Sequence, residues 1–156
     1  MGKILVENVP NEFNGLNFIR YVVMGLERIM GNEAAKSNLY RAGRIRGLEI
    51  INNLDLCLTS KPLSEWSSLF SQALSQDGTC VCSVKKVEYD EACYRVYLNK
   101  FIRSINEEQE LKSLFSFTQG VIQGGLEALT GKRFSGVNMT SAELGGDVEF
   151  VEFKIR

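Results

Sequence analysis

Glycine stands on the apolar side of a predicted helix, where a bulky core residue is the usual choice. In residues 120–136, GVIQGGLEALTGKRFSG, the apolar positions recur at helical spacing: Val121, Ile122, Leu126 and Leu129. Gly120, Gly124 and Gly125 lie among them. A glycine inside a helix costs about 1 kcal/mol relative to alanine, so the set costs about 2–3 kcal/mol. We therefore expect another backbone, a partner subunit or a ligand against this helix. Helix-on-helix packing explains the pattern better than ligand contact.

Four amphipathic helices are predicted along the chain. The first covers about 15–30, ends near Gly31 and has an apolar stripe made of Phe18, Val22, Gly25, Leu26 and Ile29. The second covers about 35–54, and glycine again enters its stripe, which consists of Leu39, Gly43, Gly47, Ile50 and Leu54. The third begins near Pro62 and stops at the SQDG segment. The fourth covers about 108–130, with Gly131 as its C-cap.

Strand patterns occupy the remaining segments. Residues 3–9 have the pattern of a short strand. After SQDG the apolar period changes from 3.6 to 2, which predicts a hairpin that turns near Asp90. Its predicted inward residues are Cys80, Cys82, Val84, Tyr94, Val96 and Leu98. The tail predicts two further strands, over about 133–142 and 147–155, with a bulge in the last one.

These elements predict an α+β fold, because the helices are grouped apart from the antiparallel strands. We expect an antiparallel β-sheet packed against a layer of about four α-helices. The chain has 156 residues, two prolines and no low-complexity linker. Residues 1–156 are therefore expected to form one domain.

Composition excludes several classes of function. The chain contains no histidine, which rules out His-based triads and every zinc or haem site that needs imidazole. A net charge of −1 gives no general attraction to nucleic acid or an anionic membrane. No apolar run is long enough for a transmembrane helix. The opening MGKILVENVPNEF lacks the pattern of a signal peptide, so we expect reduced thiols and a cytoplasmic protein.

No catalytic motif is found, and no catalytic residue, metal or cofactor is expected. The TGKR segment resembles part of a phosphate loop, but Leu126 stands where that loop needs glycine, and a helix precedes the segment instead of a strand. Cys80 and Cys82 alternate with Val84 and fit buried apolar side chains better than metal ligands. Arg41, Arg44 and Arg46 fit a solvated helix face better than an anion site.

Four segments resemble the 4-vinyl reductase (4VR) domain family, which is related to hydrocarbon-binding sensor domains and to the small subunits of TRAPP vesicle-tethering complexes. They are GLERIMG, LYRAGRIRG, PLSEWSSLFSQALSQDG and LEALTGKRFSGVNMTSAELGGDVEFVEFKI. The resemblance covers nearly the whole chain and implies a sheet backed by helices, dimers, and an apolar cavity between the two layers. Many members have cysteines on both sides of a Gly-Asp turn in the tail. Ala142 and Phe150 stand at those positions, so the metal site often built there is expected to be absent.

Three functions follow from the residues and the resemblance. The first is a non-catalytic module that binds a small hydrophobic ligand, such as a tetrapyrrole, an aromatic or a lipid-like molecule. The alternative is a structural or adaptor subunit that dimerises, scaffolds an assembly and fills its core with its own side chains. The third is a 4-vinyl reductase-type accessory protein in tetrapyrrole synthesis, although the chain has no dinucleotide fingerprint.

The ligand site is expected between the helices and the sheet, in a cavity of about 300 Å³ or more. Its predicted wall consists of Tyr40, Trp66, Phe70, Phe117 and Val121. Tyr40 is expected to be the polar handle, because a buried phenol seeks a hydrogen-bond partner. The alternative interpretation is that the same aromatic residues simply fill the hydrophobic core. We also expect a homodimer formed through residues 15–30 or 35–54, and no nucleic-acid partner.

Overall fold

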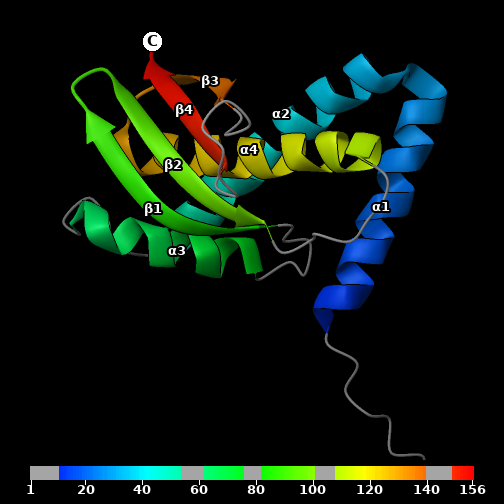
Figure 1. Cartoon of the computed structure of the whole chain (residues 1–156), viewed down its shortest axis with the longest axis horizontal. Coiled ribbons are helices and arrows are strands. Elements are labelled where there is room, and N and C mark those ends of the chain that lie inside the picture. Colours follow the sequence, from blue (N-terminus) through cyan, green and yellow to red (C-terminus); the bar gives the residue numbers. More distant parts are fainter. Residues whose placement is uncertain (1–10, 54–61, 76–81, 101–107, 140–148) are drawn as a thin grey trace, which may run out of the picture.

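The computed structural model describes residues 11–53, 62–75, 82–100, 108–139 and 149–156. Within these ranges four helices and four strands form an α+β fold (Figure 1). The helices are α1 (Asn11–Met30), α2 (Asn32–Asn53), α3 (Leu63–Ser75) and α4 (Glu108–Thr130). The strands are β1 (Cys82–Asp90), β2 (Cys93–Lys100), β3 (Phe134–Met139) and β4 (Glu149–Ile155). The strand predicted over 3–9 lies outside the described residues.

The four strands form one antiparallel sheet in the order β1-β2-β4-β3. Helices α3 and α4 pack against one face of this sheet, α2 packs on α4, and α1 lies beside α2 and α4, away from the sheet (Figure 1). This arrangement confirms the predicted fold class. Val84, Val96 and Leu98 are buried on the helix side, as the period-2 pattern indicates. Cys80 lies outside the described residues.

The bulge of the sheet lies in β1 and not in the last strand. The register of β1 against β2 shifts between Val84 and Lys86, so Lys85 is the extra residue. β4 pairs without a shift from Glu149 to Ile155. The bulge predicted in the last strand is therefore wrong over these residues. Its apolar residues simply occupy both faces, with Phe150 beside Tyr97 on one face and the buried Val151 and Phe153 on the other.

Two glycines end helices where the sequence predicts it. Gly31 follows α1 with φ 81°, and Gly131 follows α4 with φ 67°. The amide of each donates to the carbonyl four residues earlier, that of Glu27 and that of Glu127, at 2.9 Å in both cases. This is the left-handed C-cap that glycine adopts at little cost. The cap at Gly31 turns the chain directly from α1 into α2.

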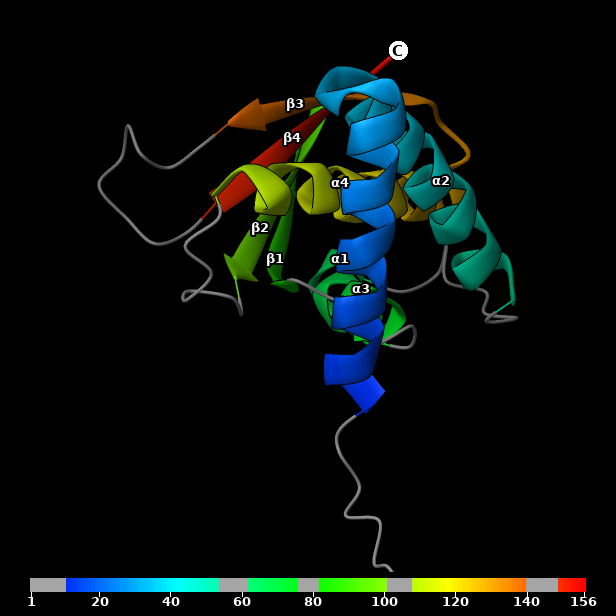
Figure 2. The same cartoon turned by 90° about the vertical axis from the view of Figure 1, so that its right-hand side faces the viewer.

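Helix α4 is central to the fold. It lies between the sheet on one side and α2 on the other (Figure 2), and every residue from Thr118 to Glu127 is buried. Helical spacing divides its surface into three sides. One side carries Gly120 and Gly124 and meets α2, a second carries Gly125 and meets α3, and a third carries Gln123 and Glu127 and meets both α2 and the start of β3. A helix buried all round must match a different neighbour on each side.

Within the described ranges, no helix combines the length and the apolar character that a membrane crossing requires.

Candidate functional site

The glycines of α2 are in contact with the backbone of α4. A Cβ atom on Gly43 would overlap the carbonyl oxygen of Phe117 and lie 3.0 Å from the amide nitrogen of Val121. A Cβ on Gly47 would overlap the carbonyl oxygen of Val121 and lie 2.9 Å from the amide nitrogen of Gly125. No side chain larger than hydrogen fits at either position without moving a backbone.

The glycines of α4 are likewise in contact with the backbone of α2. A Cβ on Gly120 would overlap the carbonyl oxygen of Tyr40, and one on Gly124 would overlap that of Arg44. Each step of four residues along α2 is matched by a step of four along α4, so the two helices run parallel. The occupant expected opposite the glycine stripe is therefore a second backbone. The glycine face of α2 is used within the chain.

Gly125 serves a different purpose. Its missing side chain makes room for the ring of Phe70, since a Cβ there would overlap Cε1 and lie 3.2 Å from Cζ. Phe70 is almost completely buried. α3 therefore reaches α4 through one aromatic ring placed over one glycine.

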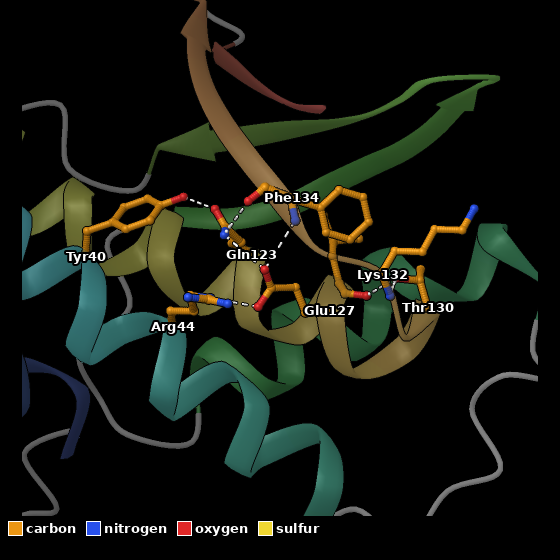
Figure 3. Close-up of polar contacts among 8 residues, drawn as sticks. Tyr40, Arg44, Gln123, Glu127, Thr130, Lys132 and Phe134 are labelled. Carbon is orange, nitrogen blue, oxygen red and sulfur yellow. Dashed lines mark hydrogen bonds and ion pairs between the residues drawn. The ribbon is translucent and has the colours of Figure 1, made fainter. Parts of the chain in front are cut away.

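A chain of polar groups joins α2, α4 and β3 (Figure 3). The Tyr40 hydroxyl donates to Oε1 of Gln123. The Gln123 amide group then donates to the carbonyl oxygen of Phe134 at 2.9 Å and to Oε1 of Glu127 at 3.1 Å. Both functions of the buried Gln123 amide are thus satisfied, as a polar group in a core requires.

Glu127 is the acceptor at the centre of this network. Its side chain is 7% exposed, and Nε of Arg44 donates to Oε2 at 2.7 Å. The amide of Phe134 donates to Oε1 at 3.2 Å. The expectation that Arg44 belongs to a solvated face is wrong for this residue, because its side chain is only 35% exposed and is paired. Sequence reasoning missed Gln123 and Glu127, although polar residues four apart on a helix rich in buried glycine were a usable signal.

A second group of residues, the aromatic cluster, surrounds Tyr94 and consists of Trp66, Tyr89, Tyr94 and Phe134. The Tyr94 ring lies 5.8 Å from Trp66 at 13° between the ring planes, and 4.5 Å from Tyr89. Phe134 approaches edge-on at 5.5 Å and 89°. These are the offset and edge-to-face arrangements that aromatic pairs prefer. The cluster joins α3, β1, β2 and β3.

Tyr94 differs from Tyr40 in its hydrogen bonding. Tyr94 is 7% exposed, and burial raises the pKa of its phenol, with a smaller contribution from Tyr89. No residue in the described part of the chain forms a hydrogen bond with its hydroxyl, whereas Tyr97 on the other face of β2 donates to Glu88 at 2.9 Å. Sequence reasoning placed Tyr94 inward but gave it no role.

The five predicted site residues divide by environment. Trp66, Phe70 and Val121 belong to the main buried cluster, and Phe117 packs against it while partly exposed. Tyr40 is half-buried on the polar side of α4, where its hydroxyl is already bonded. A cavity among these residues stays a prediction.

Cys93 is the cysteine whose side chain the structure describes. It is buried and has a free thiol. Burial, and then Glu152, raise the pKa of this thiol. Within the described residues, no three acidic or cysteine side chains gather as metal ligands would. Cys57 and Cys80 lie outside the described residues, and the side chain of Cys82 is not described. The absence of a metal site therefore stays a prediction.

No other described helix or strand covers the outward face of α1 (Figure 2). Phe18, Tyr21 and Ile29 are 69%, 72% and 83% exposed. Gly25 lies in the same stripe, and a Cβ added there would meet nothing within 4 Å. Of the large residues predicted to form the apolar stripe of this helix, Phe18, Val22 and Ile29 thus remain exposed, whereas Leu26 packs against the core.

Comparison with known proteins supports the fold. No family model matches the sequence, and no curated protein does. Subunit 3 of the trafficking protein particle complex from Naegleria fowleri, covalently bound to palmitic acid, is similar with a TM-score of 0.62 and 16% identity, over 96% of this chain and 97% of the other. The phenol-responsive sensory domain of the transcription activator PoxR, solved with phenol, is similar with a TM-score of 0.61 and 15% identity, over 88% of this chain and 72% of the other. The chain therefore has a fold that resembles TRAPP subunits and this sensory domain.

Proposed function

We propose that the protein is a non-catalytic module that binds a small hydrophobic molecule, aromatic, tetrapyrrole or lipid-like, between its helices and its sheet. The observation that carries the proposal is the aromatic cluster around Tyr94, which joins Trp66 of α3 to three strands and extends from the core to the exposed Tyr89. Flat apolar side chains with one polar group among them are the usual lining of a small-molecule site. The proposed wall is the predicted one and consists of Tyr40, Trp66, Phe70, Phe117 and Val121.

Two similarities support this proposal. The TRAPP subunit is named as covalently bound to palmitic acid, and the PoxR domain as bound to phenol. Both molecules are small and largely apolar, and both proteins share the fold of this chain. We also propose that the chain is a relative of the 4VR and hydrocarbon-sensor group, that residues 1–156 act as one domain, and that it works in the cytoplasm.

Trp66 makes the ligand proposal measurable, because it is the single tryptophan and lies within the aromatic cluster. We expect a tetrapyrrole, an aromatic compound or a fatty acid to change its fluorescence saturably. A Trp66→Phe variant supplies the blank for signals that arise from the ligand alone. Emission that stays flat with all three classes of ligand would contradict the proposal.

The second candidate is an adaptor that self-associates, and the exposed stripe of α1 favours it. Phe18, Tyr21, Val22 and Ile29 lie at helical spacing on one exposed face. Burial of this stripe would remove about 500 Å² per chain from water, or about 1,000 Å² in a symmetric pair, which reaches the lower range for a specific interface. We propose a homodimer in which α1, and not the glycine face of α2, meets its copy.

Light scattering at micromolar concentration tests the dimer. We expect the unaltered protein to be dimeric and Ile29→Asp to be monomeric, because a buried carboxylate at the interface is costly. Ile45→Asp is the matched control, since Ile45 is also an exposed isoleucine on a helix but belongs to α2. A monomeric unaltered protein, or equal behaviour of both variants, would reject α1 as the interface.

A further inference from the structure

We propose that Tyr94, and not Tyr40, is the polar anchor of the ligand site, and that the ligand is a small aromatic compound bearing a carbonyl or carboxylate acceptor. This inference rests on the proposed ligand-binding function and names the residue and the ligand chemistry that the function requires. Tyr94 lies at the end of the sheet where the β1–β2 turn, the start of α3 and the start of β3 come together, and Trp66 is the residue that this region shares with the proposed wall.

The hydroxyl groups of Tyr40 and Tyr94 differ in whether they are available to form a hydrogen bond with a ligand. The Tyr40 hydroxyl already donates to Gln123, so a ligand would have to break a bond that links α2 to α4. The Tyr94 hydroxyl has no hydrogen-bond partner among the described residues. Among the described residues, each side-chain nitrogen or oxygen atom that is completely sealed from solvent has a hydrogen-bond partner. The Tyr94 oxygen is therefore not sealed, although more than nine-tenths of the residue is buried.

The surroundings of Tyr94 favour an aromatic ring. Trp66, Tyr89 and Phe134 lie around it with ring centres 4.5–5.8 Å away. Tyr89 is exposed and extends this ring surface from the core to the solvent. A further flat ring can join such a set through offset or edge contacts, which add to the free energy of apolar burial.

The polar groups near Tyr94 determine which substituent the aromatic ring of the ligand must carry. The Tyr94 phenol is protonated at neutral pH and so acts as a donor, which calls for an acceptor on the ligand. The ammonium nitrogen of Lys132 lies 5.8 Å from the centre of the Tyr89 ring. Lys132 forms no ion pair within the described residues and is exposed. A neutral carbonyl satisfies the phenol, and a carboxylate would in addition be attracted by the ammonium group beside Tyr89.

Matched ligands separate the hydrogen bond from apolar burial. Acetophenone and ethylbenzene have nearly the same shape, but only acetophenone carries an acceptor. By ligand-observed NMR titration of the full chain, we expect acetophenone to bind about tenfold more tightly than ethylbenzene, the worth of one hydrogen bond. Benzoate tests the charged form, and we expect Lys132→Met to weaken benzoate selectively and to leave acetophenone unchanged.

Three tyrosine variants locate the anchor. Tyr94→Phe should bind both neutral ligands with equal affinity, and it should stay folded because it removes a hydroxyl without a partner. Tyr97→Phe is the control on the opposite face of the same strand, and Tyr40→Phe tests the other phenol; both should keep the tenfold preference. Loss of the preference in Tyr40→Phe but not in Tyr94→Phe would overturn the proposal and leave ligand binding intact. Failure of all three compounds to bind the unaltered chain would overturn this ligand chemistry, whereas a lipid or tetrapyrrole that still quenches Trp66 would uphold the broader function.

Discussion

The cost of a glycine depends on what its missing side chain would meet. Gly124 and Gly25 make a matched pair, since both lie inside helices. A Cβ on Gly124 would overlap the backbone of Arg44, whereas one on Gly25 would meet nothing within 4 Å. We expect Gly124→Ala to lower the free energy of unfolding by about 1–3 kcal/mol, because two backbones must separate. Gly25→Ala should raise it by up to about 1 kcal/mol through helix propensity. Urea denaturation measures both, and changes of the same sign would refute the packing explanation.

The buried carboxylate of Glu127 gives a second test on a single residue. Glu127→Gln keeps the shape but replaces an acceptor with an amide group, while donors from Arg44 and Phe134 still face it. We expect a loss of about 1–3 kcal/mol in the free energy of unfolding. Glu33→Gln is the control, because its ion pair with Lys36 involves a carboxylate that is 89% exposed; no measurable change is expected there. Equal effects in the two variants would mean that the network contributes nothing.

Tyr94 predicts a pH dependence at the alkaline end. Burial raises the pKa of its phenol in the folded state above the ordinary value near 10. The corresponding stability is fully present below that ordinary value and is lost as pH rises through the raised pKa, because the unfolded chain ionises first. We expect the unaltered protein to lose more stability between pH 8 and pH 11 than Tyr94→Phe does. Parallel curves for the two proteins would contradict the desolvation of this phenol.

At the scale of elements, the parallel packing of α2 and α4 is the feature that organises the fold. Two glycines four residues apart on each helix let the backbones touch, and two polar links four residues apart, Tyr40–Gln123 and Arg44–Glu127, lie beside them. The glycine surfaces alone repeat every turn and do not fix one register. The polar links do, since a shift by one turn would separate Glu127 from Arg44.

The edge strand β1 supplies a test of a single element. The Ser71 hydroxyl of α3 donates to the carbonyl of Val84 at 3.1 Å and accepts from its amide at 3.0 Å. It thus occupies backbone groups that another strand would otherwise pair with. We expect Ser71→Ala to lower the free energy of unfolding by about 1–2 kcal/mol and to speed hydrogen exchange at the Val84 amide. Ser67→Ala, at a partly exposed serine of the same helix that forms no hydrogen bond with the described residues of β1, should change neither, and unchanged exchange in Ser71→Ala would disprove the role.

Prediction from sequence succeeded where the signal was local. The 3.6 period and the Gly131 cap gave α4 its bounds, and the glycine stripes of α2 and α4 indicated close packing. The bulge at Lys85 was missed because it depends on how β1 pairs with β2, which no local pattern encodes. Arg44 was misjudged for a similar reason. Its partner, Glu127, is 83 residues away, and nothing near Arg44 distinguishes it from the exposed Arg41.

At the scale of the whole molecule, the chain combines a tightly packed helix pair, an aromatic cluster in its core and an uncovered apolar helix face. The helix pair accounts for the glycines, so these positions carry no ligand argument. The aromatic cluster supports a bound small molecule, and the α1 stripe supports a second copy. The two proposals are independent, because Ile29→Asp should abolish the dimer without changing the fluorescence response of Trp66 to a ligand.

Native mass spectrometry of the protein purified from its own host tests ligand binding most directly. The chain alone accounts for 17.5 kDa. We predict an additional mass of a small apolar molecule on the native protein, removed when the protein is unfolded and identified in the released fraction. A native species that contains only the mass of the chain, or a multiple of it, would contradict the binding function and favour the adaptor.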